Sequence, residues 1–473
     1  MRYLIVILSL LITIYCKSNE YTTTIFGSNL NYTGSIIKVY KTIDYITNTK
    51  ELIAIDTVDK QGNFKLQFKQ SKTLLINIPL GIYNTVLFTE PNKIYKVILP
   101  PYQPKTKADI LNPFYKPVEM YLGIKNADSL NINYQIANFN GLYHQYIDKN
   151  TDLIFKRKNK IEVDSIIKKI ESYYTKDTND FFKNYRKYSY AFLKYTSYLK
   201  DYRYVVREYY YNQPFLYQNP AYMDLFNQIF TNYLSMYMET REGNRIYSDI
   251  AYAKSPMYAK ETFANNMVLL NDTLSELVLM KGIYDAFNYK TFPIKSLIIT
   301  LDSISCCSNI KYHKIISKNI KTKVLKARQG FDAPRFKLTN INDSVITSDS
   351  LFKKFVYLNF ISIESFTCMQ DFELLKKLYK EHNNDFNIVS ISIDDNFEET
   401  KKYFFEKGYN WTLLNYKNQK SVIDEYKVKA YPSYYLINPY GKLSLSPAVS
   451  PGENFEWFFF KIKKQYDKLH QLK

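Results

Sequence analysis

Residues 355–381 read FVYLNFISIESFTCMQDFELLKKLYKE, and this stretch decides the fold of the C-terminal part of the chain. Phe355–Phe360 is a short, mostly apolar run, which is typical of a strand buried on both faces. Met369–Glu381 has apolar residues at helical spacing and predicts an amphipathic helix. Asn387–Ile393 and Glu398–Lys407 repeat the order of strand and helix. The pattern therefore predicts a sheet with crossover helices.

The same alternation extends in both directions from this stretch. Asp332–Leu338 precedes it, and Ala430–Ile437 follows it as a later strand segment. Asn438–Lys442 predicts a hairpin turn that leads to a last strand and to a helix from Glu453. We expect an α/β domain over residues 327–473.

These segments resemble the TlpA/ResA and AhpC/TSA branch of the thioredoxin superfamily over residues 331–473. The markers are the A-P-x-F-x-L entry at Ala333–Leu338, the strand-then-cysteine segment, V-x-x-x-P-S-Y-Y from Val428, and an x-x-x-G-K turn. The resemblance implies a thioredoxin fold and a thiol-disulfide oxidoreductase ancestry. It also implies that the regions before this domain are N-terminal extensions like those of many envelope lipoproteins.

The redox motif of that family, W-C-x-x-C, is incomplete in this chain. Matching strand to strand places Glu364 at the tryptophan, Ser365 at the first cysteine, Cys368 at the second, and Asp371 where the family often has Glu. In the family the first cysteine lies at a helix N-terminus, where the helix dipole stabilises the attacking thiolate. A serine hydroxyl is not ionised at neutral pH and so cannot replace the thiolate as the attacking group. Two-cysteine exchange is therefore not expected within the S-F-T-C motif.

Three interpretations of this motif stay open. The domain is a binding or structural module without turnover. Alternatively, Cys368 exchanges disulfides with Cys306, Cys307 or a cysteine of a partner protein. In the third interpretation, Cys368 is a peroxidatic cysteine. Two observations argue against it: Ile361 stands where the peroxiredoxin motif has proline, and no arginine that could polarise a peroxide follows Arg335.

The adjacent cysteines Cys306 and Cys307 end a helix that we predict to begin at Pro293. Apolar residues of that helix should pack into the core of the helical domain. We therefore expect both cysteines to lie well away from Cys368, and Cys368 to be buried behind Ser365.

The resemblance also implies a binding surface around a cis peptide bond between Tyr431 and Pro432. In this fold a cis X-Pro faces the active-site cysteines, and the backbone beside it, here including Ser433, pairs with an extended substrate. The expected partners are envelope proteins or peptides.

The N-terminus predicts export. Arg2 supplies a positive start, and Leu4–Tyr15 is apolar but shorter than the ~20 residues that span a bilayer, so it suits the core of a signal peptide. The run ends at Cys16, which resembles the lipidated cysteine of a bacterial lipoprotein, although Tyr15 stands where Gly or Ala is usual. We expect residues 1–16 to be a lipoprotein-type signal. The protein would then be anchored by a lipid on Cys16 at the periplasmic or outer-membrane side of the envelope.

Residues 20–104 predict an antiparallel β-sandwich, and residues 105–326 predict an all-helical domain. The expected strands are Thr22–Phe26, Ile36–Tyr40, Leu52–Val58, Phe64–Phe68, Leu74–Ile78, Thr85–Thr89 and Tyr95–Leu99. In the helical range, Thr273–Glu276 matches a capping box, and a helix is expected over His313–Lys326. The many tyrosines of this range are interpreted as packing residues. The fold class is thus multidomain α+β.

Composition excludes several classes of function. With 473 residues, 46% hydrophobic content and 12 glycines, the chain suits about three packed domains. The net charge of +19 is not gathered into a Lys/Arg block, so no nucleic-acid partner is expected. Four cysteines are too few for a disulfide scaffold, and the four histidines have no metal-ligand spacing. No metal and no cofactor are predicted.

Overall fold

The computed structural model describes residues 21–106, 109, 112, 115–125, 128–199, 201–289 and 291–471. The chain divides into two compact units: one holds the N-terminal sheets and most of the helices up to residue 316, and the other holds residues 317–473 together with the short segments 105–116 and 304–307. The lipoprotein-type signal predicted over residues 1–16, with Cys16, lies outside the described residues. Among the helices described, none is both long and apolar enough to cross a membrane.

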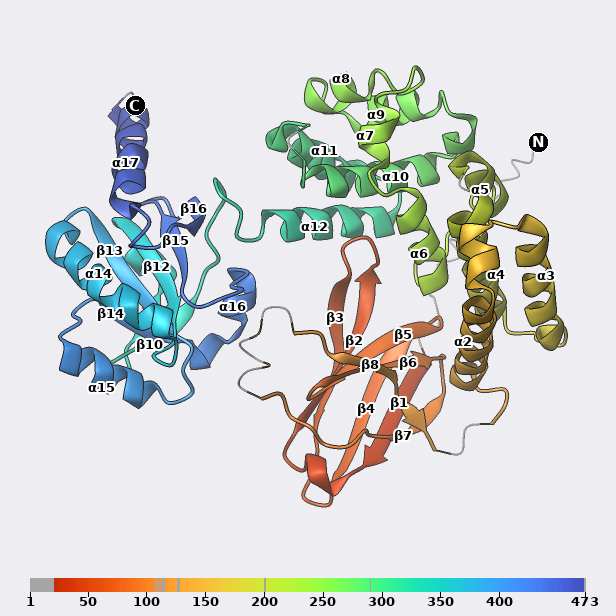
Figure 1. The fold of residues 1–473 in the computed structure, drawn as a ribbon, viewed down its shortest axis with the longest axis horizontal. Coiled ribbons are helices and arrows are strands. Elements are labelled where there is room, and N and C mark those ends of the chain that lie inside the picture. The colour runs from red at the N-terminus through yellow and green to blue at the C-terminus, as the bar shows by residue number, and fades with distance from the viewer. Residues whose placement is uncertain are drawn as a thin grey trace, which may run out of the picture. The chain divides into compact units, whose positions relative to one another are not determined.

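The N-terminal domain is a β-sandwich of two sheets with one shared apolar core, drawn in red and orange in Figure 1. A four-stranded sheet has the order β4-β1-β7-β9, and a five-stranded sheet has the order β3-β2-β5-β6-β8. The strands are β1 (Tyr21–Ser28), β2 (Ile36–Asp44), β3 (Thr49–Thr57), β4 (Asn63–Gln70), β5 (Leu74–Leu80), β6 (Tyr83–Thr89), β7 (Ile94–Ile98), β8 (Val118–Tyr121) and β9 (Gly123–Ile124). Each of the seven expected strands is present.

Strands β8 and β9 correct the expected limit of this domain. β8 pairs parallel with β6, and β9 pairs antiparallel with β7. Both fall in the range that we expected to be all-helical, so that prediction is wrong for residues 118–124. The sandwich is also not fully antiparallel, because β1 pairs parallel with β7. The two strands are too short to carry an alternating pattern, and the open sheet edges provide their backbone partners.

The central region is helical, as predicted. Its longer elements are α2 (Ile132–Lys149), α3 (Lys160–Glu171), α4 (Asp180–Lys194), α5 (Tyr202–Tyr209), α6 (Pro220–Ile229), α7 (Tyr233–Tyr237), α8 (Ile246–Ala251), α9 (Pro256–Phe263), α10 (Asp272–Ala286), α11 (Ile294–Cys307) and α12 (Lys311–Leu325). Single π-helical segments, η2 (Asp152–Lys156) and η4 (Tyr195–Leu199), follow α2 and α4. Short 3₁₀ turns lie at Ser172–Tyr174 and Met267–Leu269 of this region, and another, Leu30–Tyr32, lies between β1 and β2 of the sandwich.

The predicted capping box at Thr273–Glu276 is wrong. The N-cap lies two residues earlier, at Asn271, whose side chain accepts a hydrogen bond from the Leu274 N–H, and helix α10 begins at Asp272. Glu276 is buried instead, and its Oε1 lies 2.7 Å from His313 Nδ1. Asparagine supplies the N-cap of α2, α3, α4 and α6 as well. The asparagine-rich composition therefore marks helix starts in this region.

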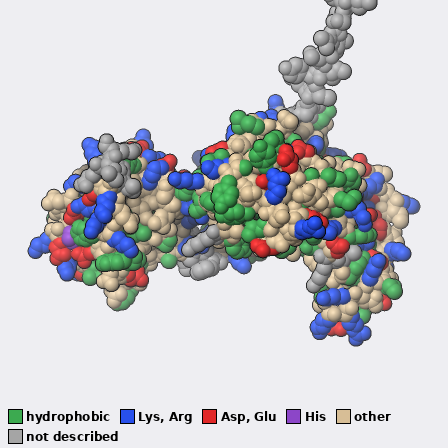
Figure 2. Space-filling view, turned by 90° about the horizontal axis from the view of Figure 1, so that it is seen from above, with side chains coloured by type: hydrophobic (Ala, Val, Ile, Leu, Met, Phe, Trp, Pro, Cys, Tyr) green, Lys and Arg blue, Asp and Glu red, His purple; other side chains and the backbone are tan. Residues whose placement is uncertain are grey.

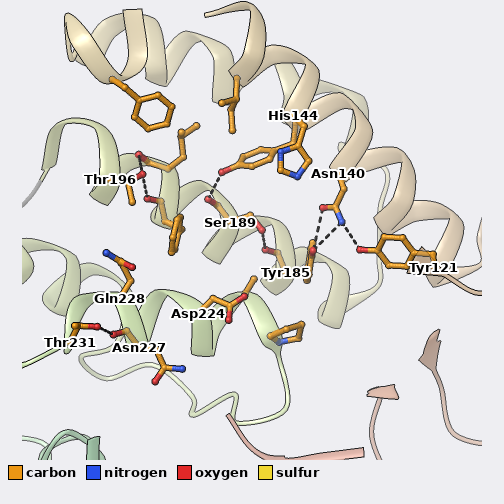
Figure 3. A pocket seen from close by; sticks show the side chains of 17 residues that line it. Tyr121, Asn140, His144, Tyr185, Ser189, Thr196, Asp224, Asn227, Gln228 and Thr231 are labelled. Carbon is orange, nitrogen blue, oxygen red and sulfur yellow. Dashed lines mark hydrogen bonds between the residues drawn. The ribbon is translucent and has the colours of Figure 1, made fainter. Parts of the chain in front are cut away.

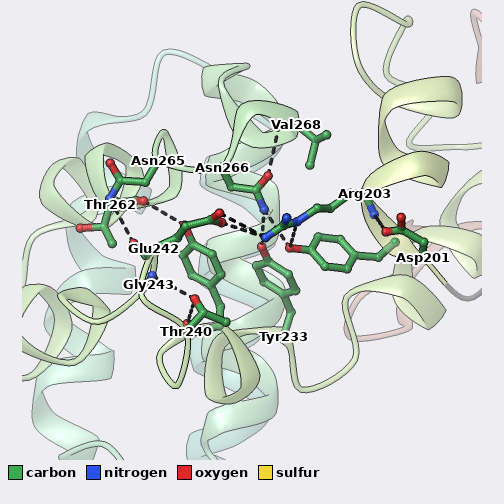
Figure 4. A network of polar contacts seen from close by, with 12 residues as sticks. Asp201, Arg203, Tyr233, Thr240, Glu242, Gly243, Thr262, Asn265, Asn266 and Val268 are labelled. Atoms are coloured by element: carbon green, nitrogen blue, oxygen red, sulfur yellow. Dashed lines mark hydrogen bonds and ion pairs between the residues drawn. The ribbon is translucent and has the colours of Figure 1, made fainter.

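Many tyrosines of the helical region are packing residues that also carry polar contacts, although the hydroxyls of Tyr174, Tyr190 and Tyr222 are buried without a hydrogen-bond partner among the described residues. Figure 4 shows such a network, in which the Arg203 guanidinium contacts Glu242 Oε2 at 3.1 Å and the Tyr202 hydroxyl at 3.3 Å. Asn266 Nδ2 donates to the hydroxyls of Tyr202 and Tyr233 at 2.9 and 3.2 Å. A buried tyrosine needs such a partner for its hydroxyl. The helices are thus joined by aromatic packing with polar ends.

Positive charge is dispersed over the face of the molecule that Figure 2 shows. In Figure 2 the Lys and Arg side chains are scattered among polar and apolar ones and are interrupted by Asp and Glu. On this face the basic side chains do not gather into one continuous patch.

The C-terminal unit has a seven-stranded sheet with the order β11-β10-β14-β13-β12-β15-β16. The parallel pairs β12–β13 and β13–β14 form its centre. The strands are β10 (Lys337–Asn340), β11 (Val345–Thr347), β12 (Phe355–Ile361), β13 (Phe386–Ser392), β14 (Thr412–Asn415), β15 (Ser433–Ile437) and β16 (Leu443–Ala448). The helices are α13 (Ser348–Leu351), α14 (Phe366–His382), α15 (Phe397–Lys407), η6 (Tyr416–Gln419), α16 (Ser421–Glu425) and α17 (Phe455–Gln471).

Separate apolar cores cover the two faces of this sheet. Alternate residues of β12 face opposite sides, so Tyr357 belongs to the core that contains α14 and α17, while Leu358 belongs to the core that contains α16. The turn predicted at Asn438–Lys442 is present, and Gly441 adopts φ +72° there. This left-handed backbone conformation favours glycine, and a Cβ at Gly441 would also lie 2.9 Å from a ring carbon of Phe352. The expected fold class, with sandwich, helical region and C-terminal α/β domain, is confirmed.

Candidate active site

The candidate site lies where buried strand β12 leads into helix α14. Ser365 is the N-cap of α14, with φ −89° and ψ 115°, and its Oγ accepts a hydrogen bond from the Cys368 N–H at 3.4 Å. Serine is among the residues preferred at this position, because its oxygen satisfies an otherwise unpaired N–H of the first turn. The residue at the expected attacking position therefore has a structural role in starting the helix.

Cys368 is fully buried, with 0% of its surface exposed, and it is a free thiol. It packs in the core that includes Ile361 and Phe372. Burial raises the pKa of the Cys368 thiol, and the negative charges of Asp371 and Asp394 act in the same direction, while contacts from Ser365 and Ser362 oppose them. The thiol is thus neutral and shielded from solvent.

The segment around Pro432 meets the start of α14 in space. The Tyr431–Pro432 peptide bond is cis. The Ser365 hydroxyl donates to the Tyr431 carbonyl oxygen at 3.3 Å, across 66 positions of sequence. Ser433 begins β15, and its hydroxyl donates to the Ala430 carbonyl oxygen at 2.6 Å. The structure therefore brings Ser365, Cys368 and the Tyr431–Ser433 segment together.

Asp371 lies one turn further along α14 and is 8% exposed. The Tyr434 hydroxyl donates to Asp371 Oδ2 at 2.7 Å. Burial raises the pKa of the Asp371 carboxyl, although the hydrogen bond from Tyr434 opposes the shift. Tyr434 in turn stacks on Tyr357 with ring centroids 5.1 Å apart. Asp371 is thus fixed between α14 and β15 rather than open to a substrate.

A buried carboxylate that the sequence analysis missed, Asp394, braces the loop before Ser365. Asp394 accepts from the Ser362 hydroxyl at 2.5 Å and from the Ile363 N–H at 3.1 Å. It also accepts from Thr400 of α15 at 2.9 Å. Ser362 and Asp394 follow the neighbouring parallel strands β12 and β13, whose carboxyl ends meet at one edge of the sheet. That placement is the signal that could have identified them.

Asn359 is a second residue that the sequence analysis missed. It lies on β12 between Tyr357 and Ile361, both of which belong to the same core as Cys368. Asn359 is 0% exposed, and neither Nδ2 nor Oδ1 has a hydrogen-bond partner among the described residues. A buried amide without partners costs free energy. The signal available in the sequence was a polar residue, Asn359, within an otherwise apolar strand.

Cys306 and Cys307 are exposed at the end of α11. Leu297 and Leu301 of the same helix are fully buried, as expected. The separation of this cysteine pair from Cys368 stays a prediction.

Arg335 and a surface cluster around His382 bear on whether the domain could reduce peroxides or bind a metal ion. Arg335, the last arginine, contacts Asp349 Oδ1 at 2.8 Å and stacks on the Phe352 ring, so it is engaged away from any peroxide role. Within the part of the chain that the structure describes, the ligand atoms of Glu381, His382 and Glu456 come within 4.8 Å of one another on the surface. His382 Nε2 is hydrogen-bonded to Glu456 Oε1 at 2.8 Å, so these two ligand atoms are already engaged with each other.

Comparison with known proteins agrees with this architecture. Residues 330–446 match the sequence model of the AhpC/TSA family. The thiol-disulfide oxidoreductase ResA of Bacillus subtilis is 28% identical over 116 residues, which cover 24% of this chain and 64% of the length of ResA. The C-terminal domain is TlpA/ResA-like. The rest of the chain lies outside both matches.

Solved structures of similar proteins cover the same TlpA/ResA-like domain. The thioredoxin domain of a thiol-disulfide oxidoreductase from Bacteroides vulgatus is 20% identical, with a TM-score of 0.27, and the match covers 28% of this chain and 98% of that one. A thiol-disulfide oxidoreductase from Bacteroides fragilis is 21% identical, with a TM-score of 0.25, over 27% of this chain and 97% of that one.

Proposed function

We propose that this protein is an exported envelope lipoprotein whose TlpA/ResA-like domain acts as a binding or structural module and not as a disulfide-exchange enzyme. The observation that carries the proposal is the pair Ser365 and Cys368. The first is committed to the N-cap of α14, and the second is fully buried with a raised thiol pKa. Thiol exchange needs an accessible thiolate, because the thiolate is the attacking species.

The surface beside Ser365 supports binding. Phe366, the first residue of α14, is 69% exposed, and the half-buried segment Tyr431–Ser433 contacts the preceding residue, Ser365. An exposed aromatic ring next to such a backbone segment suits an extended peptide, which would place one side chain against the ring. We propose an extended segment of an envelope protein as the client.

Thiol trapping tests the function in cells. Acid quenching followed by alkylation and mass spectrometry would report the state of Cys368, Cys306 and Cys307. The proposal expects Cys368 to be recovered as a free thiol, with no cross-link to another protein. A mixed disulfide on Cys368 would instead establish the alternative, in which Cys368 exchanges with Cys306, Cys307 or a partner cysteine.

The lipid anchor is tested separately. Labelling with radioactive palmitate should mark the wild-type protein and should be lost in Cys16→Ala. Cys306→Ala is the matched control, because it removes a different cysteine and should leave the label unchanged. Unlabelled wild-type protein would contradict the anchor but leave the proposed binding module intact.

A further inference from the structure

The helical region contains a pocket of about 820 Å³ between α2, α4 and α6, shown in Figure 3. This volume is in the range of pockets that hold small organic ligands. Its walls combine aromatic rings with a few amides and hydroxyls and one carboxylate. All of the lining residues lie between Tyr121 and Thr231, so the pocket belongs entirely to the first compact unit.

The aromatic wall is held in place by hydrogen bonds. Asn140 Nδ2 of α2 donates to the Tyr121 hydroxyl at 2.9 Å and to the Tyr185 hydroxyl of α4 at 3.1 Å. The Tyr143 hydroxyl donates to the Ser189 carbonyl oxygen at 3.0 Å. These contacts fix the rings of three tyrosines from three elements before any ligand arrives. A pre-formed wall lowers the entropy lost on binding.

Asp224 supplies the only charged carboxylate among the lining residues, and no lysine or arginine is among them. In Figure 3 it projects from α6 into the space between the helices. Within the described part of the chain, no residue forms a hydrogen bond or ion pair with this carboxylate. Solvent reaches it through the pocket, yet protein surrounds it on most sides, and this burial raises the pKa of Asp224 to about 6.

A second polar group at the pocket lacks a partner. Asn227 Nδ2 donates to the Tyr45 carbonyl oxygen at 2.9 Å, which fixes the orientation of the amide. Asn227 Oδ1 is then buried without a donor among the described residues. The pocket also borders both π-helical segments, through Phe155 of η2 and Thr196 of η4. Such π-helical turns are frequent at functional sites.

We propose that this pocket binds an organic cation, an alkylammonium group joined to an apolar or aromatic body. The cation would pair with the Asp224 carboxylate, while the tyrosine rings would contact its body and its charge. An ammonium group also supplies N–H donors, which the unpaired acceptors at Asp224 and Asn227 lack. The same chemistry could come from a free amine or from a lysine side chain of a peptide.

The test compares tyramine with tyrosol, two probes that differ only in an ammonium or a hydroxyl group, by calorimetric titration of the purified protein. We expect saturable binding of tyramine and at least about tenfold weaker binding of tyrosol. Asp224→Asn should weaken tyramine binding by at least about tenfold. Asp148→Asn, an exposed position on α2 outside the lining, removes the same charge and should leave binding unchanged.

Three outcomes would overturn the proposal: equal affinity for the two probes, equal effects of the two substitutions, or no saturable binding up to about 10 mM. The source of the cation is distinguished by a blocked lysine tripeptide. Competition by this peptide at lower concentration than tyramine would indicate a lysine side chain, and weaker competition would indicate a free amine.

The thermal midpoint of Asp224→Asn gives an independent readout. The titratable groups that face Asp224 are Tyr45, Tyr121, Tyr143, His144, Tyr185 and Tyr210. A carboxyl whose folded pKa is about 6, above its ordinary 3.8, destabilises the fold increasingly as pH rises between these values. Asp224→Asn should therefore raise the midpoint at pH 7, and the gain should vanish below about pH 4. A lowered midpoint at pH 7 would mean that Asp224 has a structural partner, which contradicts the proposal.

Discussion

The start of α14 and the pocket of the helical region differ in how their polar groups are satisfied. At the start of α14 the Ser365 hydroxyl meets the Tyr431 carbonyl oxygen, and the Asp371 carboxylate meets the Tyr434 hydroxyl. In the pocket, Asp224 and Asn227 Oδ1 have no partner among the described residues. At the site with a family motif, these polar side chains are thus hydrogen-bonded within the protein. The pocket, which has no family motif, has polar groups available to a ligand. Family resemblance locates a fold, and unmet polar groups indicate where a polar ligand would be recognised. The peptide surface proposed beside Ser365 would depend instead on the exposed Phe366 ring and on backbone pairing.

Opening the closed site is the change with the largest expected effect. Ser365→Cys places a thiol at the N-terminus of α14, where backbone N–H groups and the helix dipole favour the thiolate. Disulfide-exchange activity should rise by about two orders of magnitude or more. The adjacent Glu364 should keep the pKa of the new thiol above the value usual for such sites.

The double variant Ser365→Cys/Cys368→Ser is the matched control. It keeps the new thiol but lacks the resolving one, so it should form mixed disulfides without turnover. If Ser365→Cys neither oxidises nor reacts with a thiol probe, the alignment of Ser365 with the first cysteine is wrong.

Thiol reactivity sharpens the comparison without changing the site. Cys306 and Cys307 are exposed, and Cys368 is 0% exposed, so an aromatic disulfide probe should react with Cys368 at least about a hundredfold more slowly. Cys306→Ala/Cys307→Ala isolates the slow phase. The difference should disappear in 6 M guanidinium chloride, about the concentration that unfolds even stable domains. Fast labelling of Cys368 in the folded protein would show that the site is open.

Asn359 is an exception to the satisfied site, because its buried amide has no partner among the described residues. Asn359→Leu keeps the number and branching of side-chain heavy atoms and removes the unmet polar atoms, so the free energy of unfolding should rise by about 1–3 kcal/mol in urea titrations. Asn359→Asp is the matched control and should be strongly destabilising, since it buries a charge. A loss of stability in Asn359→Leu would mean that the amide has a partner, such as an internal water.

The smallest expected effect concerns the N-cap itself. Ser365→Ala should lower the free energy of unfolding by about 1 kcal/mol, because the Cys368 N–H loses its acceptor. Ser344→Ala, in the exposed turn between β10 and β11, should change it little. Equal effects of the two substitutions would argue against the capping role of Ser365.

The sequence predicted the parts of the fold that rest on local pattern. The apolar run of β12, the helix after it and the segment around Pro432 were all readable because each repeats a known period or marker. Strands β8 and β9 were not, because they are short and depend on the edges of sheets formed far away in sequence. The start of α10 was misplaced for a related reason: Thr273–Glu276 fits a capping box, but Asn271 precedes it and caps first.

The candidate site was predictable only in part. Ser365 and Cys368 follow from the motif, and their spacing fixes them on one helical turn. Asp394 and Asn359 could not be chosen from sequence, because their roles depend on which strand ends and faces meet in three dimensions. Asp224 had no sequence signal at all, since an acidic residue on a helix is ordinary until its surroundings are known.

The central claim, that the TlpA/ResA-like domain has lost turnover, is tested most directly by one steady-state measurement. Reduction of insulin by dithiothreitol would be followed with wild-type protein and with Cys368→Ser. The account predicts that both proceed at the rate of the reaction without protein, because the Cys368 thiol is buried and Ser365 cannot attack. A wild-type rate well above that background, abolished by Cys368→Ser, would contradict it.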